Sequence, residues 1–329
     1  MIKQNYNKSQ KFKKSQQGLS LIELMISMVV SLFLLAGVVT NFISTKNADI
    51  KREALSEMDS GASIALEALR QTISHGGYQG IDNITLDKAF YTEADHDNGG
   101  AENATCGTGS ATNIWSPIAP LNDRFTQDEG SGDQISIVYR ADNPCLAGEA
   151  SCDTAAKQNP SAQIYYDCAG GGQDRSDPRV VACSTDSENG GMIDPTQSKI
   201  YSSFHLILDP GNVNDRALFC RGSRGDSQII SDNIEAIQYL YGVTDNNGLT
   251  YYRDASQVET NNQWGEVTSV QVGVLMRSSR QNVLDQASTK TSYNLLETPI
   301  NIAAGDLRRL FKVYTTTINL ENVSIGEIL

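Results

Sequence analysis

Apolar residues run almost without interruption from Leu19 to Ile43, and this run contains a single ionisable side chain, Glu23. As a helix, these 25 or so residues would be ~37 Å long at ~1.5 Å per residue, which exceeds the ~30 Å core of a bilayer. The run is too long for the apolar core of a secretory signal peptide, and no small-x-small cleavage site follows it. The pattern therefore predicts a membrane-spanning helix over residues 19–43.

The helical pattern continues beyond the apolar run. Between Lys46 and Ser74 there is no proline, and Gly61 is the only glycine. Apolar residues recur there at spacings of three and four, which places them on one face of a helix: Leu55, Met58, Ala62, Ala65, Leu66, Leu69 and Ile73. We expect this amphipathic half, residues 44–75, to pack on the following domain and to end at His75-Gly76-Gly77.

Residues 76–329 change from helical to strand-like periodicity. Apolar and polar residues alternate in several short runs, and Asp245-Asn246-Asn247-Gly248 separates two of them as a hairpin turn. Alternation with hairpin turns predicts an antiparallel sheet with one buried face, so the fold class is α+β. The expected strands are Gln134–Arg140, Ile200–Leu208, Ile237–Val243, Leu249–Arg253, Val267–Arg277 and Lys312–Leu320. Segments rich in Gly, Asn, Asp and Ser, near residues 90–132 and 142–197, are expected to be loop insertions.

Charge is unevenly distributed along the chain. Residues 1–18 hold five lysines and no acidic residue, and the whole chain has a net charge of −13, so the remainder carries −18. The basic leader predicts a cytoplasmic N-terminus and an exported domain after the helix. The acidity of that domain argues against nucleic acid as a direct partner, because phosphate binding requires positive charge.

Six cysteines all follow the apolar run, at Cys106, Cys145, Cys152, Cys168, Cys183 and Cys220. Their spacings contain no CxxC and no Cys/His cluster, which argues against zinc. An even number in an exported domain favours disulfides that pin the loops. Six cysteines allow 15 pairings. We favour the short-range pairs Cys145–Cys152 and Cys168–Cys183.

The sequence offers no enzymatic motif, cofactor motif or metal site. HExxH, GxSxG, Walker A and GxGxxG are all missing, and His75, His96 and His205 are far apart in the chain. The stretch Asp95–Gly100 resembles the opening of a calcium loop, but its twelfth position is Cys106 instead of glutamate. We therefore expect a protein that is not an enzyme and that holds no metal or cofactor.

Glu23 requires an explanation, because a carboxylate inside a bilayer needs a partner or a function. No basic residue lies between Lys14 and Lys46, so the chain offers no nearby cation. If the chain were cut between Gly18 and Leu19, the new α-amino group would be a positive charge at the same membrane depth. A neighbouring copy displaced along the helix axis could place that amine against Glu23, so the acid suits an assembly of helices.

These residues resemble a known processing signal. The segment Gly18-Leu19-Ser20-Leu21-Ile22-Glu23, after a basic leader and before an apolar helix, resembles the class III signal of type IV prepilins and pseudopilins. The resemblance implies cleavage between Gly18 and Leu19 by a prepilin peptidase, N-methylation of Leu19, and a role for Glu23 as the assembly carboxylate. It also implies a pilin-like fold.

Later segments are similar to PilW-type minor pilins, which are related to the J-type minor pseudopilins of type II secretion. The similar segments are Leu69-Arg70, Gly76–Gly80, Ile234–Val243, Val272–Ser278 and Leu307–Phe311 with Thr315–Thr317. The resemblance implies a minor pilin that helps to initiate a type IV pilus and caps its tip, serving motility, adhesion or DNA uptake. It implies other minor pilins, the major pilin, the inner-membrane assembly platform and a large tip adhesin as partners.

Two alternatives stay open at this stage. The chain could be a minor pseudopilin of a type II secretion system. Alternatively, it could be a pilus-displayed adhesin whose loops bind a ligand. In either pilin-like role we expect a single-pass inner-membrane protein with a periplasmic C-terminal domain before assembly, and an extracellular tip subunit afterwards.

Overall fold

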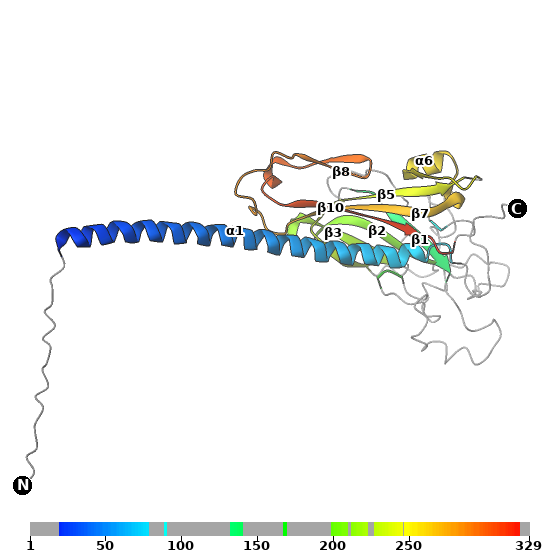
Figure 1. Cartoon of the computed structure of the whole chain (residues 1–329). Helices are drawn as coiled ribbons and strands as arrows, with labels where there is room; N and C mark the ends of the chain where they lie inside the picture. Colours follow the sequence, from blue (N-terminus) through cyan, green and yellow to red (C-terminus); the bar gives the residue numbers. More distant parts are fainter. Residues whose placement is uncertain are drawn as a thin grey trace, which may run out of the picture. The chain divides into compact units, whose positions relative to one another are not determined.

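A computed structural model of the chain describes the positions of most of the helix and strand residues (Figure 1). The described residues are 20–78, 89–90, 132–140, 167–169, 199–209, 212–222, 227–245 and 247–322. The chain divides into two compact units, Met1–Lys51 and Arg52–Leu329. The expected insertions near 90–132 and 142–197 lie almost wholly outside the described residues.

The helix α1 runs from Leu21 to Ser74 and spans 54 residues. It ends where the sequence predicts, at a turn in which the Gly76 amide donates to the carbonyl of Ile73 at 3.0 Å. Gly77 follows with φ of 76°, a left-handed conformation that glycine adopts without steric cost. The Gly77 amide then donates to the carbonyl of Val138 at 2.9 Å, which ties the helix end to a strand of the same unit.

The second half of α1 buries one face, as its periodicity predicts. The buried residues follow spacings of four, four, three, four and four: Ala54, Met58, Ala62, Ala65, Leu69 and Ile73. The expectation for Leu55 was wrong, because its side chain is 39% exposed. A residue one position after Ala54 is rotated by ~100° around the helix axis, so Leu55 lies beside the buried stripe instead of within it.

Two four-stranded antiparallel sheets form the rest of the unit. The first sheet has the order β1-β2-β3-β4, and the second has the order β10-β7-β5-β6. The first contains β1 (Ile135–Arg140), β2 (Lys199–Asp209), β3 (Asn212–Gly222) and β4 (Ser227–Asp232). The second contains β5 (Ile234–Thr244), β6 (Thr250–Arg253), β7 (Val267–Arg277) and β10 (Phe311–Asn319). All six ladders within these sheets are antiparallel, which confirms the predicted sheet type. The expectation of one buried face was wrong for the second sheet, because apolar clusters cover both faces of β5 and β7.

Smaller elements complete the second unit. A short hairpin pairs β8 (Ser292–Leu295) with β9 (Thr298–Asn301). The helix α6 (Ala255–Thr260) begins with a capping box in which Asp254 accepts from the Gln257 amide and the Gln257 side chain accepts from the Asp254 amide. Single 3₁₀ turns cover Trp264–Glu266 and Ala304–Asp306.

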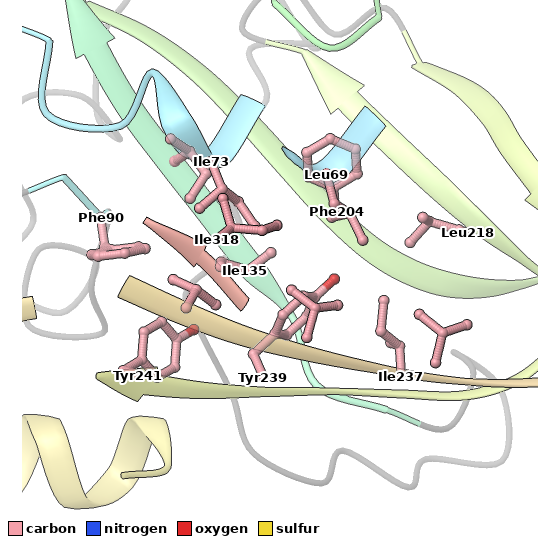
Figure 2. Packing of buried hydrophobic residues seen from close by; sticks show 14 of the residues in the cluster. Leu69, Ile73, Phe90, Ile135, Phe204, Leu218, Ile237, Tyr239, Tyr241 and Ile318 are labelled. Atoms are coloured by element: carbon pink, nitrogen blue, oxygen red, sulfur yellow. The ribbon is translucent and has the colours of Figure 1, made fainter. Parts of the chain in front are cut away.

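The main core combines the two sheets with the buried face of α1 (Figure 2). Leu69 and Ile73 enter it from the helix, among side chains of both sheets. Those side chains include Ile135, Phe204 and Leu218 of the first sheet and Ile237, Tyr239, Tyr241 and Ile318 of the second. A smaller apolar cluster lies on the opposite face of β5 and β7, where the β8–β9 hairpin packs: Ala236, Leu275, Leu295, Ile300 and Ile302.

One disulfide joins described residues, and it corrects the sequence-based expectation. Cys168 is bonded to Cys220 of β3, with their Cα atoms 5.9 Å apart, so the expected pair Cys168–Cys183 is wrong. The Cys168 amide also donates to the Ser202 hydroxyl of β2 at 3.0 Å. Spacing along the chain could not find this pair, because the sheet brings residues 52 positions apart together. Cys106, Cys145, Cys152 and Cys183 lie outside the described residues.

Candidate functional site: the apolar half of α1

The first half of α1 exposes apolar side chains on every face. From Leu21 to Ile43 the large apolar residues are between 46% exposed, at Val39, and 78% exposed, at Leu21. Soluble monomers rarely expose a contiguous apolar surface of this extent, so the segment requires either lipid or other helices around it. Within the described residues, α1 is the helix long and apolar enough to cross a membrane.

The hydroxyl groups in this half bond back to the helix itself. Ser27 donates to the carbonyl of Leu24 at 2.9 Å, Ser31 to Ser27 at 2.7 Å, and Thr40 to Ala36 at 2.8 Å. A hydroxyl bonded to the preceding turn needs no water, so these side chains are compatible with hydrocarbon or with a packed helix bundle. Ser27, Ser31 and Thr40 are visible in the sequence as small hydroxyl residues within an apolar run, but their bonds to the preceding turn follow only from the helix geometry.

Glu23 is the remaining charged group of this half. It lies in the first turn of α1, and its amide donates to the carbonyl of Ser20 at 3.0 Å. Its side chain is exposed. The nearest basic residue that follows is Lys46, 23 positions later, or about 35 Å along a helix. A basic group for Glu23 must therefore come from the chain N-terminal to Ser20 or from another molecule.

The position of Glu23 allows three physical roles. An acid in the first turn stabilises a helix by interaction with the partial positive charge of its N-terminus. The spacing Ser20-x-x-Glu23 is also that of a capping box. An ionised carboxylate can in addition pair with a cation from a neighbouring subunit. Glutamine could replace glutamate in a capping box but carries no charge, so this substitution separates capping from the two roles that need the charge.

The other predicted site residues fall into two groups. Gly18 and Leu19, the expected cleavage site, lie outside the described residues. The calcium-like stretch Asp95–Gly100 and His96 lie outside them as well. His75 follows the end of α1, and His205 is on β2 beside Phe219, with ring centroids 5.6 Å apart. No group of three or more His, Cys, Asp or Glu side chains that could hold a metal occurs among the residues that the structure describes.

Family models match both ends of the chain. The model of the prokaryotic N-terminal methylation motif matches residues 13–39, and the model described as Type IV Pilus-assembly protein W matches residues 207–322. The two matches support a type IV pilin-like protein that is similar to the PilW type over its C-terminal third. Such proteins are structural and non-enzymatic, and they associate with other components of a pilus. The methylation motif and the apolar helix are consistent with membrane anchoring and with assembly into a pilus.

Structural and curated comparisons add two findings. A solved structure titled Type IV-like pilin TTHA1219 from Thermus thermophilus is 11% identical and has a TM-score of 0.32. The match covers 80% of the present chain and 97% of the Thermus chain. No curated protein matches the chain.

The region that matches the PilW-type model contains most strands of the two sheets. Residues 207–322 include β3 to β10, the β8–β9 hairpin and the end of β2. The segments that resembled PilW-type proteins in the sequence, Ile234–Val243 and Val272–Ser278, lie on the adjacent strands β5 and β7 or directly after them. The sequence resemblance to the PilW type is thereby confirmed for the C-terminal part of the chain.

Proposed function

We propose that this chain is a minor pilin that helps to initiate assembly of a type IV pilus and caps it within a tip complex of minor pilins. The observation that carries the proposal is the exposed apolar half of α1, whose one carboxylate has no basic residue near it in the helix. The PilW-type region of the second unit supports a minor rather than a major subunit.

The proposal gives the apolar half three successive roles. It first anchors the precursor in the inner membrane, with the lysine-rich leader in the cytoplasm. A prepilin peptidase then cuts between Gly18 and Leu19 and methylates the new amine. The same helix finally leaves the bilayer and packs among other pilin helices. Both lipid and a helix bundle can surround its apolar surface, because its hydroxyl groups are already hydrogen-bonded within the helix.

The Glu23 carboxylate makes assembly favourable in this proposal. A charged side chain at the bilayer centre costs about 3 kcal/mol on insertion scales, and the cost falls near the membrane surface. Glu23 lies only two residues from the start of α1, or ~3 Å along its axis, so the unassembled helix can keep it near the surface. Inside a helix bundle the carboxylate is desolvated, and the methylated amine of Leu19 on an adjacent subunit supplies the compensating charge.

The experiment that tests the proposal is deletion of the gene, with piliation and type II secretion measured in the same strain. Loss of surface pili with unchanged secretion, restored by the wild-type gene, supports the minor-pilin role. Loss of secretion with normal pili would show instead a minor pseudopilin. Normal levels of both would contradict an assembly role and leave the adhesin alternative.

Co-purification identifies the immediate partners. We expect the affinity-tagged full chain, extracted in mild detergent, to retain other minor pilins. Recovery of the chain without any pilin-like protein would contradict a tip complex.

A further inference from the structure

Six charged side chains meet at one end of the second unit, and they come from both sheets. Their formal charges balance, with three arginines and three carboxylates: Asp215 and Arg216 of β3, Glu235 of β5, Arg277 of β7, and Asp306 and Arg309 before β10. The side chains of Arg277 and Arg309 are each 4% exposed, and that of Asp215 is 9% exposed. The centre of the group is therefore buried, whereas Arg216 and Asp306, at 28% and 26% exposed, lie at its rim.

The contacts form a chain of ion pairs that crosses from one sheet to the other. Arg277 donates through Nη2 to Asp215 and through Nη1 to Glu235, the latter at 3.1 Å. Arg216 reaches the second carboxylate oxygen of Glu235 at 2.9 Å. Arg309 Nη2 lies 3.7 Å from the Asp215 oxygen that Arg277 also contacts. Asp215, from the first sheet, thus contacts two buried arginines, Arg277 on the second sheet and Arg309 in the segment that follows it.

Residues 278–310 connect β7 to β10 and form the strap. Arg309, near the end of the strap, bonds to the residues at its start. Its Nη1 donates to the carbonyls of Ser278 at 2.7 Å and Ser279 at 2.9 Å. The Ser278 amide donates to the Leu310 carbonyl at 2.9 Å. The two ends of the strap are consequently joined at the point where Arg309 is buried.

The strap covers the outer face of the second sheet. Its β8–β9 hairpin places Leu295 and Ile300 against Ala236 and Leu275. The approach is close, because a Cβ at Gly273 would lie 2.9 Å from Leu296 Cγ and 3.0 Å from Leu295 Cδ1. The strap is thus held at two places, by apolar packing of its hairpin and by Arg309 at its base, where the buried guanidinium lies beside carboxylates.

We propose that Asp215 makes seating of the strap conditional on docking of the two sheets. Arg309 has Asp306 within the strap, at 2.9 Å, but Asp306 is 26% exposed. Asp215 is the more deeply buried carboxylate, and only docking of β3 supplies it. A buried arginine without its carboxylate is strongly unfavourable. An undocked second sheet would thus keep the base of its strap open, and docking of the first sheet would close it.

Hydrogen exchange of the full chain in detergent tests the proposal, with Asp215→Asn as the main variant. This change preserves shape and removes the charge. We expect exchange of strap amides, such as that of Ile302, which donates to Thr291, to accelerate at least about tenfold. Exchange of β1 and β2 amides should change less. Unchanged protection of the strap in Asp215→Asn would overturn the proposal.

Two further variants keep the test decisive if Asp215→Asn folds poorly. Arg309→Gln leaves Asp215 paired with Arg277, so the sheets should stay docked while strap exchange accelerates. The double variant Asp215→Asn, Arg309→Gln leaves Arg277 with Glu235, and its strap should exchange less rapidly than the product of the two single effects predicts. Multiplicative effects would show that Asp215 and Arg309 act independently, and the proposal would fail. Asp306→Asn is the comparison, because it removes the strap's own carboxylate from Arg309 without affecting the first sheet. Its strap should exchange more slowly than that of Asp215→Asn, and equal acceleration would contradict a special role for the carboxylate of the first sheet.

Discussion

Ser231 of β4 donates its hydroxyl hydrogen to the carbonyl oxygen of Gly61 in α1, at 3.0 Å. At this contact α1 lies close to a strand of each sheet. A Cβ at Gly61 would lie 3.2 Å from Ser231 Oγ and 2.9 Å from the Cε of Met276 on β7. The single glycine of the amphipathic half therefore lies where the helix has no room for a side chain.

Enlarging Gly61 should destabilise the second unit. Gly61→Val inserts two methyl groups beyond Cβ against Ser231 and Met276, and overpacking of this kind costs about 1–3 kcal/mol. Gly61→Ala should cost less, because the gain in helix propensity of about 1 kcal/mol offsets contact with a flexible methionine end. Urea unfolding of the full chain in detergent measures both. Gly37→Ala is the control, since nothing lies within 4 Å of a Cβ there, and equal stability of Gly61→Val and wild type would refute the packing argument.

The Cys168–Cys220 disulfide should appear in a peptide map made without reduction. Closing a loop of 52 residues stabilises a fold by about 4 kcal/mol in the chain-entropy model. Replacing both cysteines by alanine should therefore lower the free energy of unfolding by about 2–4 kcal/mol. A peptide that joins Cys168 to Cys183 would contradict the structure, and a double variant as stable as wild type would show that the bond adds nothing.

Stability should fall when the pH is lowered from 7 toward 4, in part because of His205. Burial, followed by the positive charge of Arg221, lowers the pKa of His205 from 6.5 to about 4. Between these two pH values the unfolded chain binds a proton that the folded chain does not, so the free energy of unfolding decreases as the pH falls through this window. The His205 contribution is full above pH 6.5 and loses up to roughly 3 kcal/mol by pH 4.

Comparison with His205→Gln isolates this contribution from that of other groups. The variant cannot bind a proton at position 205, so its unfolding free energy should depend less on pH between 4 and 6.5. Identical pH profiles of wild type and His205→Gln, measured by urea unfolding, would show that His205 is not buried as the structure describes.

The cleavage site makes a separate prediction about processing. Gly18→Glu should leave the leader attached, because the resemblance to prepilins requires a small residue before the cut. Intact mass measurement of the membrane fraction should show the full-length precursor for this variant. Wild type should begin at an N-methylated Leu19, and any other mature N-terminus would remove the basis of the proposed function.

Elements whose pattern lies within a few neighbouring residues could be predicted from the sequence. The bounds of β7 were predicted correctly from alternation alone. The turn after β5 was also local, since the Asp245 side chain accepts the amides of Asn247 at 2.8 Å and Leu249 at 2.9 Å. The long helix and its end followed from length, periodicity and a pair of glycines.

Features that depend on distant partners could not be predicted. The strand β3 was missed because Asp215 and Arg216 interrupt its apolar pattern, and their burial is compensated by ion pairs with residues of the second sheet. The partner of Cys168 was wrong for the same reason. In the candidate site, Glu23 was found because a charge within an apolar run is visible in the sequence, whereas the bonded hydroxyls of Ser27 and Ser31 needed the helix geometry.

Incorporation of Glu23→Gln into pili tests the central claim most directly. Glutamine keeps the size and the capping capacity of glutamate but removes its charge. The measurement is the amount of the chain in sheared pili relative to the membrane, with mass spectrometry of the mature N-terminus as the control for processing. We predict normal cleavage and methylation with strongly reduced incorporation for Glu23→Gln, and normal incorporation for wild type. Incorporation of Glu23→Gln at the wild-type level would contradict the claim that Glu23 acts through an ion pair in the assembled pilus.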